Sequence, residues 1–520
     1  MRLRSRRGVL LTVTAVTAIT LPAALAVPAN ADPSSRTQQQ ILQSVKAPNV
    51  KRHLTALQAI ADANGGTRAS GTPGYAASRD YVAGKLKKAG YKVTVQPFEF
   101  PFFQENSTAT LNQISPDPTT YAPTPPDGSS VGDFATMTYS GSGDVTGTVQ
   151  AVDVMLPPPA EPGSTSGCEA EDFAGFTAGN IALMQRGTCT FEVKAANAQA
   201  AGAIGVVMFN EGQPGRTETL AGTLGTPSFT IPVVGTSFAV GEDLASPAGT
   251  AVRIATDTVS QTRTTWNVIA ESKKGRADRV VMGGAHLDSV LAGPGINDNG
   301  SGTAALLEVA VQLGKLPPKN KLRFAWWGAE ELGLLGADHY VTSLSPEEQA
   351  DIALYLNYDM VASTNFAYKI YDGDDSDAVG SPAGPPGSDE IEKTFEKYYD
   401  LLRLDHVGTD FDGRSDYGPF IAAGIPSGGL FTGAEGLKTA EEAELFGGEA
   451  GVAYDECYHQ GCDTIENIDD TALAVNTGAI AHSALTYAFS NDLPGPDTRP
   501  ATAAARTTAA DDHQHGGLTE

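Results

Sequence analysis

Histidine and carboxylate side chains occur at several points where a predicted strand ends. His286 and Asp288 follow one apolar run of the sequence, and Asp359 follows another. Two adjacent acids, Glu330 and Glu331, come shortly after a third apolar run. Zinc in proteins takes imidazole nitrogen and carboxylate oxygen as ligands, so this combination of residue types predicts a metal site.

Two further residues fit the same chemistry. Asp298 lies in the stretch Gly295-Ile-Asn-Asp-Asn-Gly-Ser-Gly before a predicted helix, and His459 lies between two cysteines. Two histidines and several carboxylates are enough for two ions that share a bridging carboxylate. Two metal ions about 3.5–4 Å apart can hold an attacking hydroxide and a polarised carbonyl group. A carboxylate that binds no metal is then needed to move the proton, and adjacent Glu330 and Glu331 point in different directions, so they can divide these roles.

Each of these residues also has an ordinary structural explanation. A single His-x-Asp pair is more often a hydrogen-bonded pair on the surface or in the core. Adjacent glutamates commonly begin a helix, where their charge favours the helix dipole. The prediction of a metal site therefore depends on the whole set in its sequence order.

The segments around this set predict an α/β domain. Apolar runs predict strands at residues 280–285, 322–327, 352–358 and 425–431, and amphipathic or Ala-rich segments predict helices at 301–313 and 470–489. Residues 40–64 and 75–89 predict two earlier helices, and residues 91–98 alternate like a strand. We expect a mostly parallel central sheet with helices on both faces, in which ligands bind at the carboxyl ends of the strands.

A different pattern interrupts this domain. Residues from about 115 to 130 are rich in Pro, Thr and Ser, as in a linker, and residues 130–258 predict short strands, turns and one helix. A strand from Ile181, the turn Arg186-Gly-Thr-Cys-Thr-Phe and a Lys-bearing helix at 194–201 follow in order, which resembles the protease-associated (PA) domain. The alternative is another small α/β lobe. We expect residues 32–129 to be the first part of the main domain with a linker, 130–258 the inserted β-rich PA domain, and 259–492 the second part with the zinc site.

The two ends of the chain predict export and a tail. Residues 1–31 contain a cationic segment, an apolar run and the small residues Ala29-Asn30-Ala31, which is typical of a cleaved signal peptide. A membrane anchor is the alternative, but the apolar run is short. The pair Arg6-Arg7 fits twin-arginine export as well as ordinary export. Residues 493–520 are rich in Pro, Thr, Ala and Asp, and we expect a disordered tail.

The charge of the chain excludes some partners. Acidic residues outnumber basic residues by 61 to 35, and the net charge is −26. Such a surface repels nucleic acid and anionic membranes, and no later stretch is apolar and long enough to span a bilayer. We therefore expect a secreted, extracellular monomer that binds neither nucleic acid nor membrane.

The four cysteines form two local pairs, Cys168 with Cys189 and Cys457 with Cys462. In an exported protein this pattern predicts two disulfide bonds. Binding of one zinc ion by four thiolates is the alternative, but neither pair has the usual spacing.

Several blocks together resemble peptidase family M28, the zinc aminopeptidases. They are Ala285-His-Leu-Asp-Ser, Gly295-Ile-Asn-Asp-Asn-Gly-Ser-Gly, Trp327-Gly-Ala-Glu-Glu-Leu-Gly-Leu-Leu-Gly and Leu356-Asn-Tyr-Asp-Met. The stretches Phe411-Asp-Gly-Arg-Ser-Asp-Tyr-Gly-Pro-Phe and Cys457-Tyr-His-Gln-Gly-Cys-Asp-Thr are similar to the branch of secreted Streptomyces aminopeptidases. The resemblance implies a secreted di-zinc aminopeptidase that removes single N-terminal residues from peptides, with a preference for large apolar residues such as leucine.

The resemblance also implies a role for each matching residue. One zinc ion is held by His286, Asp298 and Asp359, and the second by Asp298, Glu331 and His459. Glu330 is the general base, Asp288 orients His286 from behind, Tyr458 stabilises the oxyanion and Arg414 positions the reacting group. The pocket for the first side chain is lined by Met360, Gly413, Tyr458 and Phe431.

Other functions stay open at this point. An enzyme with the same scaffold can be a carboxypeptidase or a glutaminyl cyclase, and some relatives are receptors without activity. A carboxypeptidase needs cationic side chains for the terminal carboxylate, and Arg414 is the one obvious candidate. Calcium, which some relatives bind, has no clear matching site in the sequence, so calcium binding is left open.

Overall fold

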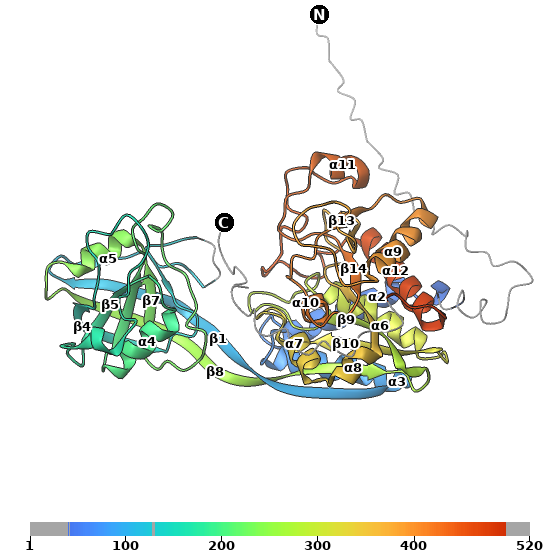
Figure 1. The fold of residues 1–520 in the computed structure, drawn as a ribbon, viewed down its shortest axis with the longest axis horizontal. Helices are drawn as coiled ribbons and strands as arrows, with labels where there is room; N and C mark the ends of the chain where they lie inside the picture. The colour runs from blue at the N-terminus through green and yellow to red at the C-terminus, as the bar shows by residue number, and fades with distance from the viewer. Residues whose placement is uncertain (1–39, 41, 127–129, 496–520) are drawn as a thin grey trace, which may run out of the picture.

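The computed structural model describes residue 40, residues 42–126 and residues 130–495. The predicted signal peptide, residues 1–31, lies outside the described residues. Residues 496–520 of the predicted tail also lie outside them. The described chain forms a larger and a smaller lobe, joined by two long strands that run side by side (Figure 1).

The larger lobe is built on a mostly parallel sheet, as the sequence predicted. Its parallel strands lie in the order β14-β11-β9-β10, and β12 and β8 flank them in antiparallel pairing. At one edge β13 pairs with β12 in parallel. The bounds are β9 Arg276–His286, β10 Asn320–Trp327, β11 Ile352–Tyr358, β12 Lys369–Tyr371, β13 Val407–Thr409 and β14 Ser427–Phe431.

Helices cover both faces of this sheet because its strands are buried on both sides. Successive residues of a strand point to opposite faces. In β9, Val281 and Ala285 belong to one apolar cluster, whereas Val280 and Met282 belong to another. The first cluster includes residues of α2 (Ala47–Ala63), α3 (Pro73–Ala89), α6 (Gly300–Leu313), α9 (Ser388–Leu402) and α12 (Asp470–Phe489). The second includes residues of α7 (Leu335–Ser343) and α10 (Tyr417–Ala422). Two short helices, α8 (Pro346–Asp351) and α11 (Ala440–Phe446), complete this lobe.

The strands that join the lobes are β1 (Lys92–Ser115) and β8 (Ala251–Glu271). They pair in antiparallel register from Lys92 opposite Glu271 to Ser115 opposite Ala251. Residues 91–98 predicted the beginning of β1, but the strand continues far beyond them. Between the lobes, Phe98, Phe100 and Phe102 of β1 form a small apolar cluster with Ala329 of the larger lobe.

The smaller lobe continues the hydrogen bonding of β8 in the order β8-β4-β5-β6-β7-β3. Strands β4 to β7 pair in parallel, and α4 and α5 pack beside them. The bounds are β2 Thr119–Thr120, β3 Phe134–Thr136, β4 Gly143–Ala151, α4 Phe191–Ala200, β5 Ile181–Gln185, β6 Gly205–Phe209, β7 Val233–Thr236 and α5 Phe238–Ala245. The predicted disulfide bond between Cys168 and Cys189 is confirmed, and a short 3-10 helix at Ala170–Phe173 lies in the segment between the two cysteines.

The stretch rich in Pro, Thr and Ser contributes to the smaller lobe. β2 pairs with β1, and Tyr121 is buried in the same apolar cluster as residues of β5 and β6. The Tyr121 hydroxyl donates to Gln113 and Asp243 at 3.1 and 3.0 Å. The composition of this stretch predicted a linker, because composition does not show that a single aromatic ring, here that of Tyr121, is packed in a core.

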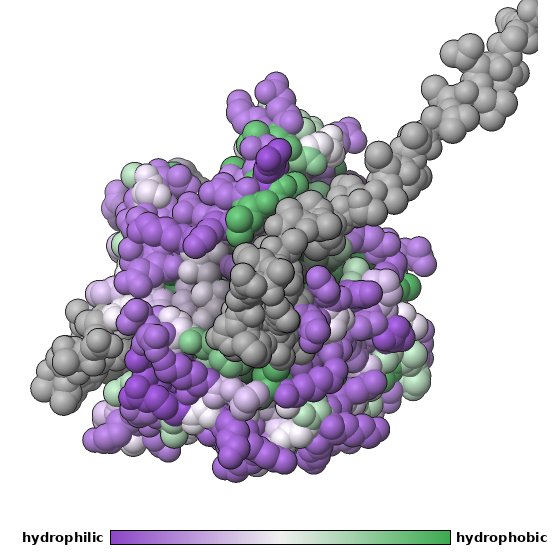
Figure 2. All heavy atoms as spheres, turned by 90° about the vertical axis from the view of Figure 1, so that its right-hand side faces the viewer, coloured by the Kyte–Doolittle hydropathy of each residue, from purple (hydrophilic) through white to green (hydrophobic). Residues whose placement is uncertain are grey.

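The surface agrees with the acidic composition. Figure 2 shows that hydrophilic residues cover most of the visible face of the larger lobe outside the grey atoms, with hydrophobic residues in small groups between them. Among the described residues, the longest helices are too short or too polar to cross a bilayer.

The apolar clusters predict that the lobes fold separately. In the described part of the chain, the clusters of the larger lobe draw on residues before 103 and after 258, and those of the smaller lobe on residues 109–254. We expect that replacing residues 106–257 by Asn-Gly, which joins the paired residues Glu105 and Thr258 in a two-residue hairpin, leaves a folded protein. A single cooperative thermal transition, followed by circular dichroism, is the measurement.

A matched variant checks that the measurement is sensitive. Phe100→Ala in the same shortened chain removes a ring that is 2% exposed and lowers the stability by about 3–5 kcal/mol. A shortened chain that melts without cooperativity, or aggregates, contradicts the independence of the lobes.

Candidate active site

Three strands deliver side chains to one edge of the sheet. β10 lies beside β9 with Trp327 opposite His286, and β11 lies on the other side of β9 with Asn357 opposite Gly284. The carboxyl ends of the three parallel strands therefore meet. His286 is the last residue of β9, Glu330 follows the end of β10, and Asp359 follows the end of β11 directly.

The start of α6 brings Asp298 to the same place. Asn299 caps this helix by accepting the N–H of Gly302 at 3.0 Å, and its side chain donates to the carbonyl of Tyr358 at 2.9 Å. A Cβ on Gly302 would lie 2.2 Å from the carbonyl oxygen of Tyr358 and 2.4 Å from Oδ1 of Asn299, so only glycine permits this approach of the helix to β11. The cap thus holds Asp298 close to the ends of β9 and β11.

A loop near the C-terminus presents His459 from the opposite side. The predicted disulfide bond between Cys457 and Cys462 is confirmed, and it closes a short loop around His459. Buried Asp463 accepts the N–H groups of Asn297 and Asp298 at 2.8 and 3.0 Å. This carboxylate therefore ties the His459 loop to the backbone of Asp298.

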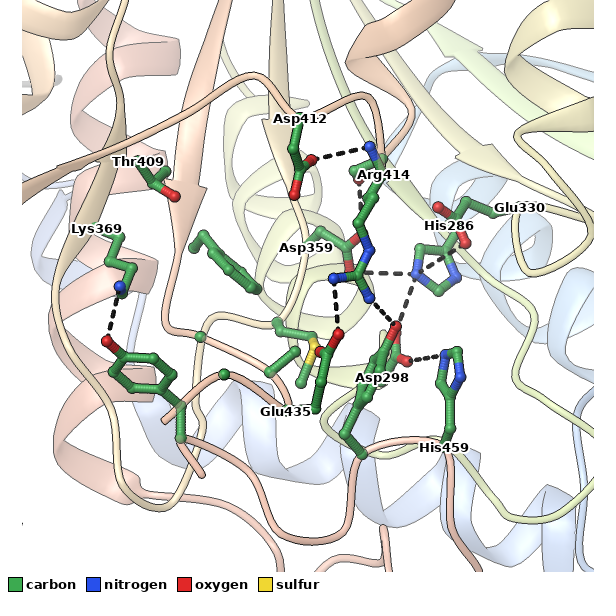
Figure 3. Close-up of a pocket in the computed structure, with 18 of the residues that line it drawn as sticks. His286, Asp298, Glu330, Asp359, Lys369, Thr409, Asp412, Arg414, Glu435 and His459 are labelled. Carbon is green, nitrogen blue, oxygen red and sulfur yellow. Dashed lines mark hydrogen bonds and ion pairs between the residues drawn. The ribbon is translucent and has the colours of Figure 1, made fainter. Parts of the chain in front are cut away.

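The result is a compact cluster of imidazoles and carboxylates (Figure 3). One oxygen of Asp298 lies 3.2 Å from Nε2 of His286, and its other oxygen lies 3.2 Å from Nε2 of His459. Asp359 is 3.2 Å from His286, and Glu331 is 2.9 Å from His459. The five proposed metal ligands therefore form two groups that share Asp298.

The donor set fits metal ions. Nδ1 of His286 lies 3.2 Å from the backbone carbonyl of Asp288, so a proton on Nδ1 is bound there and the lone pair of Nε2 faces carboxylate oxygens. The lone pair of Nε2 and the carboxylate oxygens are all electron-pair donors, so a cation between them is needed to make this contact favourable. Buried Oε1 of Glu331 has no hydrogen-bond partner, as expected for an atom that binds a metal ion. His286, Asp298 and Glu331 offer ligand atoms within 4.8 Å of one another, as do His286, Glu330 and Asp359.

The shifted pKa values of the site residues also indicate that this cluster of carboxylates needs positive charge. Burial raises the pKa of Glu330 well above its ordinary value, and the carboxylates of Asp416 and Asp359 add to this effect against the opposing charge of His286. Burial by itself lowers the pKa of His459, but Glu331 and Asp298 outweigh it and raise this pKa to about 11. A buried cluster with more carboxylates than imidazoles binds protons or cations.

Asp288, predicted to orient His286, lies directly behind it. Its backbone carbonyl is closer to Nδ1 of His286 than its carboxylate, at 3.2 against 3.9 Å. The carboxylate accepts the N–H of Glu330 at 3.3 Å, and burial raises its pKa to about 7. Asp288 thus contacts both His286 and the loop that carries the predicted base.

A cavity of about 290 Å³ opens beside the cluster. Met360, Phe431, Arg414 and Tyr458, to which the resemblance gives roles in substrate binding and catalysis, line it. The guanidinium of Arg414 donates to the Tyr458 hydroxyl at 3.2 Å and pairs with Glu435 at 2.7 Å. Gly413 is not among the lining residues, and its N–H donates to the Tyr417 hydroxyl at 2.9 Å.

Sequence reasoning missed several residues of this site. The cavity is also lined by Lys369, Tyr371, Thr409, Asp410, Asp412, Glu435 and Tyr454. Ser415 donates to Asp359 at 2.6 Å, and Asp463 holds Asp298 as described above. Ser415 and Asp412 flank Arg414 in a block that the sequence analysis had singled out, whereas Lys369 and Tyr454 have no local signal and come together only in the fold.

Comparisons with known proteins show which families this chain resembles. Residues 267–484 match Peptidase family M28, and residues 145–244 match the PA domain. An aminopeptidase of Pseudomonas aeruginosa is 50% identical over 439 residues, which cover 84% of this chain and 80% of that protein. Leucine aminopeptidase 2 of Trichophyton tonsurans is 42% identical over 471 residues, 90% of this chain and 88% of that protein.

Solved structures of aminopeptidases are also similar to this chain. An aminopeptidase from Aneurinibacillus sp. strain AM-1 has a TM-score of 0.60 and 27% identity, and the match covers 88% of this chain and 97% of that one. A zinc aminopeptidase from Bacillus subtilis has a TM-score of 0.54 and 25% identity, with the same coverage.

The disulfide bond beside His459 leads to a prediction. Its loop is short, so removing the bond changes the chain entropy of the unfolded state little, and its effect is on the position of His459. We expect the double variant Cys457→Ser and Cys462→Ser to bind zinc about tenfold more weakly with a small fall in melting temperature. Zinc content during titration with a chelator is the measurement.

The other disulfide bond supplies the control. Cys168→Ser with Cys189→Ser removes a bond in the smaller lobe and leaves zinc binding unchanged. Equal zinc binding by both double variants and the wild type contradicts a positioning role for the Cys457–Cys462 bond.

Proposed function

This chain belongs to peptidase family M28 and is a metallo-aminopeptidase, and on that premise we propose that it is a secreted enzyme with two zinc ions. We further propose that it prefers large apolar first residues such as leucine. One observation carries the proposal: the two oxygens of Asp298 face the two imidazoles His286 and His459 at 3.2 Å each. A carboxylate in this position can bridge two ions.

The ligands divide into two sets. His286, Asp298 and Asp359 would hold one zinc ion, and Asp298, Glu331 and His459 would hold the other. When bound, zinc polarises the carbonyl of the substrate and lowers the pKa of water. Asp288 and Ser415 hold ligands in place, because the backbone carbonyl of Asp288 accepts a hydrogen bond from Nδ1–H of His286 and the hydroxyl of Ser415 donates to Asp359.

Glu330 moves the proton during hydrolysis. It takes a proton from the attacking water and gives it to the departing amine. Its side chain is buried, and its nearest carboxylate oxygen lies 3.8 Å from Nε2 of His286, which is farther than the oxygens of Asp298 and Asp359. This distance supports a role as base rather than as ligand. Burial and neighbouring carboxylates raise its pKa, which favours accepting a proton.

Tyr458 and Arg414 stabilise the charge that develops on the substrate carbonyl. The Tyr458 hydroxyl donates to the oxyanion, and Arg414 holds this hydroxyl from the other side. Glu330 and Asp359 also receive the free α-amine of the substrate at the closed end of the cavity. Binding of a free amine beside the scissile bond restricts cleavage to the first residue.

The lining of the cavity supports the proposed specificity. Met360 is buried and Phe431 is partly buried, and together they offer an apolar surface to the first side chain. Relatives named leucine aminopeptidase 2 agree with this preference. Of the described lining residues, the cations Arg414 and Lys369 already pair with Glu435 and Glu442, so they are poor receptors for the terminal carboxylate that a carboxypeptidase must bind.

The division of the chain follows the same proposal. We propose that residues 32–129 are the first part of the peptidase domain together with a linker that packs on the smaller lobe, residues 130–258 the inserted PA domain, and residues 259–492 the second part of the peptidase domain. The proposed metal ligands all lie in the second part of the peptidase domain. The two disulfide bonds support an extracellular location, and we propose a monomer that acts on peptide N-termini.

The proposed reaction predicts a requirement for a free amine and for metal. We expect hydrolysis of leucine p-nitroanilide and none of its N-acetyl derivative, and complete loss of activity after removal of zinc by a chelator. Return of activity with two equivalents of zinc supports the two-metal site. Cleavage of the acetylated substrate at a similar rate contradicts the aminopeptidase mechanism.

The role of Glu330 gives a sharper test. Glu330→Gln keeps the shape of the side chain but cannot accept a proton, so we expect kcat to fall about 10²–10⁴-fold with zinc content near that of the wild type. Glu331→Gln is the matched control, because it is expected to lose zinc as well as activity. A Glu330→Gln rate within tenfold of the wild type excludes Glu330 as the base.

A further inference from the structure

The segment Thr67–Ser70, between α2 and α3, lies against the loops that carry the site. It comes before the smaller lobe in the chain, whereas the loops come after it, so more than two hundred residues separate the contacting groups. Arg68, the centre of this segment, is fully buried. A buried guanidinium is uncommon, and its hydrogen bonds show what it holds.

Arg68 binds both ends of one loop. Nη1 donates to the carbonyl of Leu287, Nε donates to Pro294 at 2.8 Å, and Nη2 donates to Gly295 at 2.5 Å. Leu287 follows the ligand His286 directly, and Gly295 precedes the bridging ligand Asp298 by three residues. The planar guanidinium therefore fixes the distance between the start and the end of the loop that joins these two ligands.

Neighbouring residues of the segment extend this contact. Thr67 donates to the carbonyl of Val290 at 2.8 Å, and the N–H of Arg68 donates to the hydroxyl of Ser289 at 3.0 Å. Ser70 accepts the N–H of Ala329 at 2.7 Å, directly before Glu330. One segment thus holds the loop after β9 and the loop after β10.

The charge of Arg68 also matches its surroundings. Burial lowers the pKa of Arg68 to about 10, opposed by Asp288, Asp463, Asp298 and Glu331, and the group stays protonated at neutral pH. A buried charge without compensation is costly, and here Nε, Nη1 and Nη2 each donate to a backbone carbonyl while the charge of the guanidinium faces carboxylates.

We propose that Arg68 is a positioning residue for the metal centre, which sets the spacing of His286 and Asp298 so that both bind the same ion. The proposal rests on the proposed zinc site. Arg68 touches neither the substrate nor the reacting atoms, and it acts through the backbone of residues 287–295. Loss of the guanidinium lets the two ligands move apart, and zinc binding weakens before the fold is lost.

Two variants test this role. Arg68→Lys keeps the charge and the aliphatic chain, but a single nitrogen cannot donate to the three carbonyls in the geometry of the guanidinium, and Arg68→Met removes the charge as well. The measurements are zinc content by atomic emission during chelator titration, melting temperature, and kcat and KM for leucine p-nitroanilide. We expect Arg68→Lys to bind zinc about 10- to 100-fold more weakly and to lower kcat, with KM changed less than about twofold.

A control separates positioning from general stability. Arg323 in β10 is also a largely buried arginine, and it donates to Glu271 and to the Tyr340 hydroxyl. Arg323→Lys is expected to lower the melting temperature but to leave zinc binding unchanged. A folded Arg68→Lys enzyme with wild-type zinc binding and kcat overturns the proposal, and so does an equal loss of zinc in Arg323→Lys.

A smaller change covers the case in which neither Arg68 variant folds. Ser289→Ala removes the hydroxyl that accepts from Arg68 and donates to Gly293 at 3.0 Å, and it leaves the guanidinium in place. The Ser289 hydroxyl binds the backbone N–H of Arg68 and so helps to hold the same loop. Weaker zinc binding in this variant shows that the ligands depend on how residues 287–295 are held and supports the proposal, whereas unchanged zinc binding shows that the ligands tolerate a loosened loop and overturns it. If the wild-type chain itself does not bind two zinc ions, the proposed function is wrong. If the wild type binds two zinc ions and the Arg68 variants bind zinc as tightly as it does, only the positioning role of Arg68 is wrong.

Discussion

The carboxylate of Asp298 stands between two imidazoles, with one oxygen facing His286 and the other facing His459 at 3.2 Å. An anion in this position is buried and needs compensation, because removing a charge from water is costly. Burial opposes the charged form of Asp298, but hydrogen bonds with the two histidines outweigh it and lower its pKa. The surrounding structure can be understood as the means of holding this one group in place.

Backbone conformation shows where the fold accepts strain to do so. Ala329, Met360 and His459 have φ angles of 55°, 49° and 58°, in the left-handed region that residues other than glycine rarely adopt. Each lies at the site: Ala329 precedes Glu330, Met360 follows Asp359, and His459 is itself a proposed ligand. The neighbouring hydrogen bonds, such as that from the N–H of Ala329 to Ser70, stabilise these conformations.

The separation of the lobes places the chemistry on one rigid body. The ligands come from strand ends and helix starts of the larger lobe, where residues are packed on both faces of the sheet. The smaller lobe meets this body through β1 and β8, and the aromatic residues of β1 contact Ala329 beside the proposed base. This contact joins β1, which continues into the smaller lobe, to the loop that carries Glu330.

The sequence by itself determined the elements and the residue types of the site. Periodic apolar runs gave α12 its full length and placed β9, β10 and β11 within a few residues, since burial on one or both faces leaves a regular pattern. The order of histidines and carboxylates predicted a metal centre, and paired cysteines predicted both disulfide bonds. Only the tertiary structure decided that β1 runs through both lobes, that Lys369 and Tyr454 share the cavity, and that Arg68 holds residues 287–295. These contacts join residues that are far apart in the chain, so no local sequence pattern predicts them. The sequence also does not distinguish a buried arginine from an exposed one.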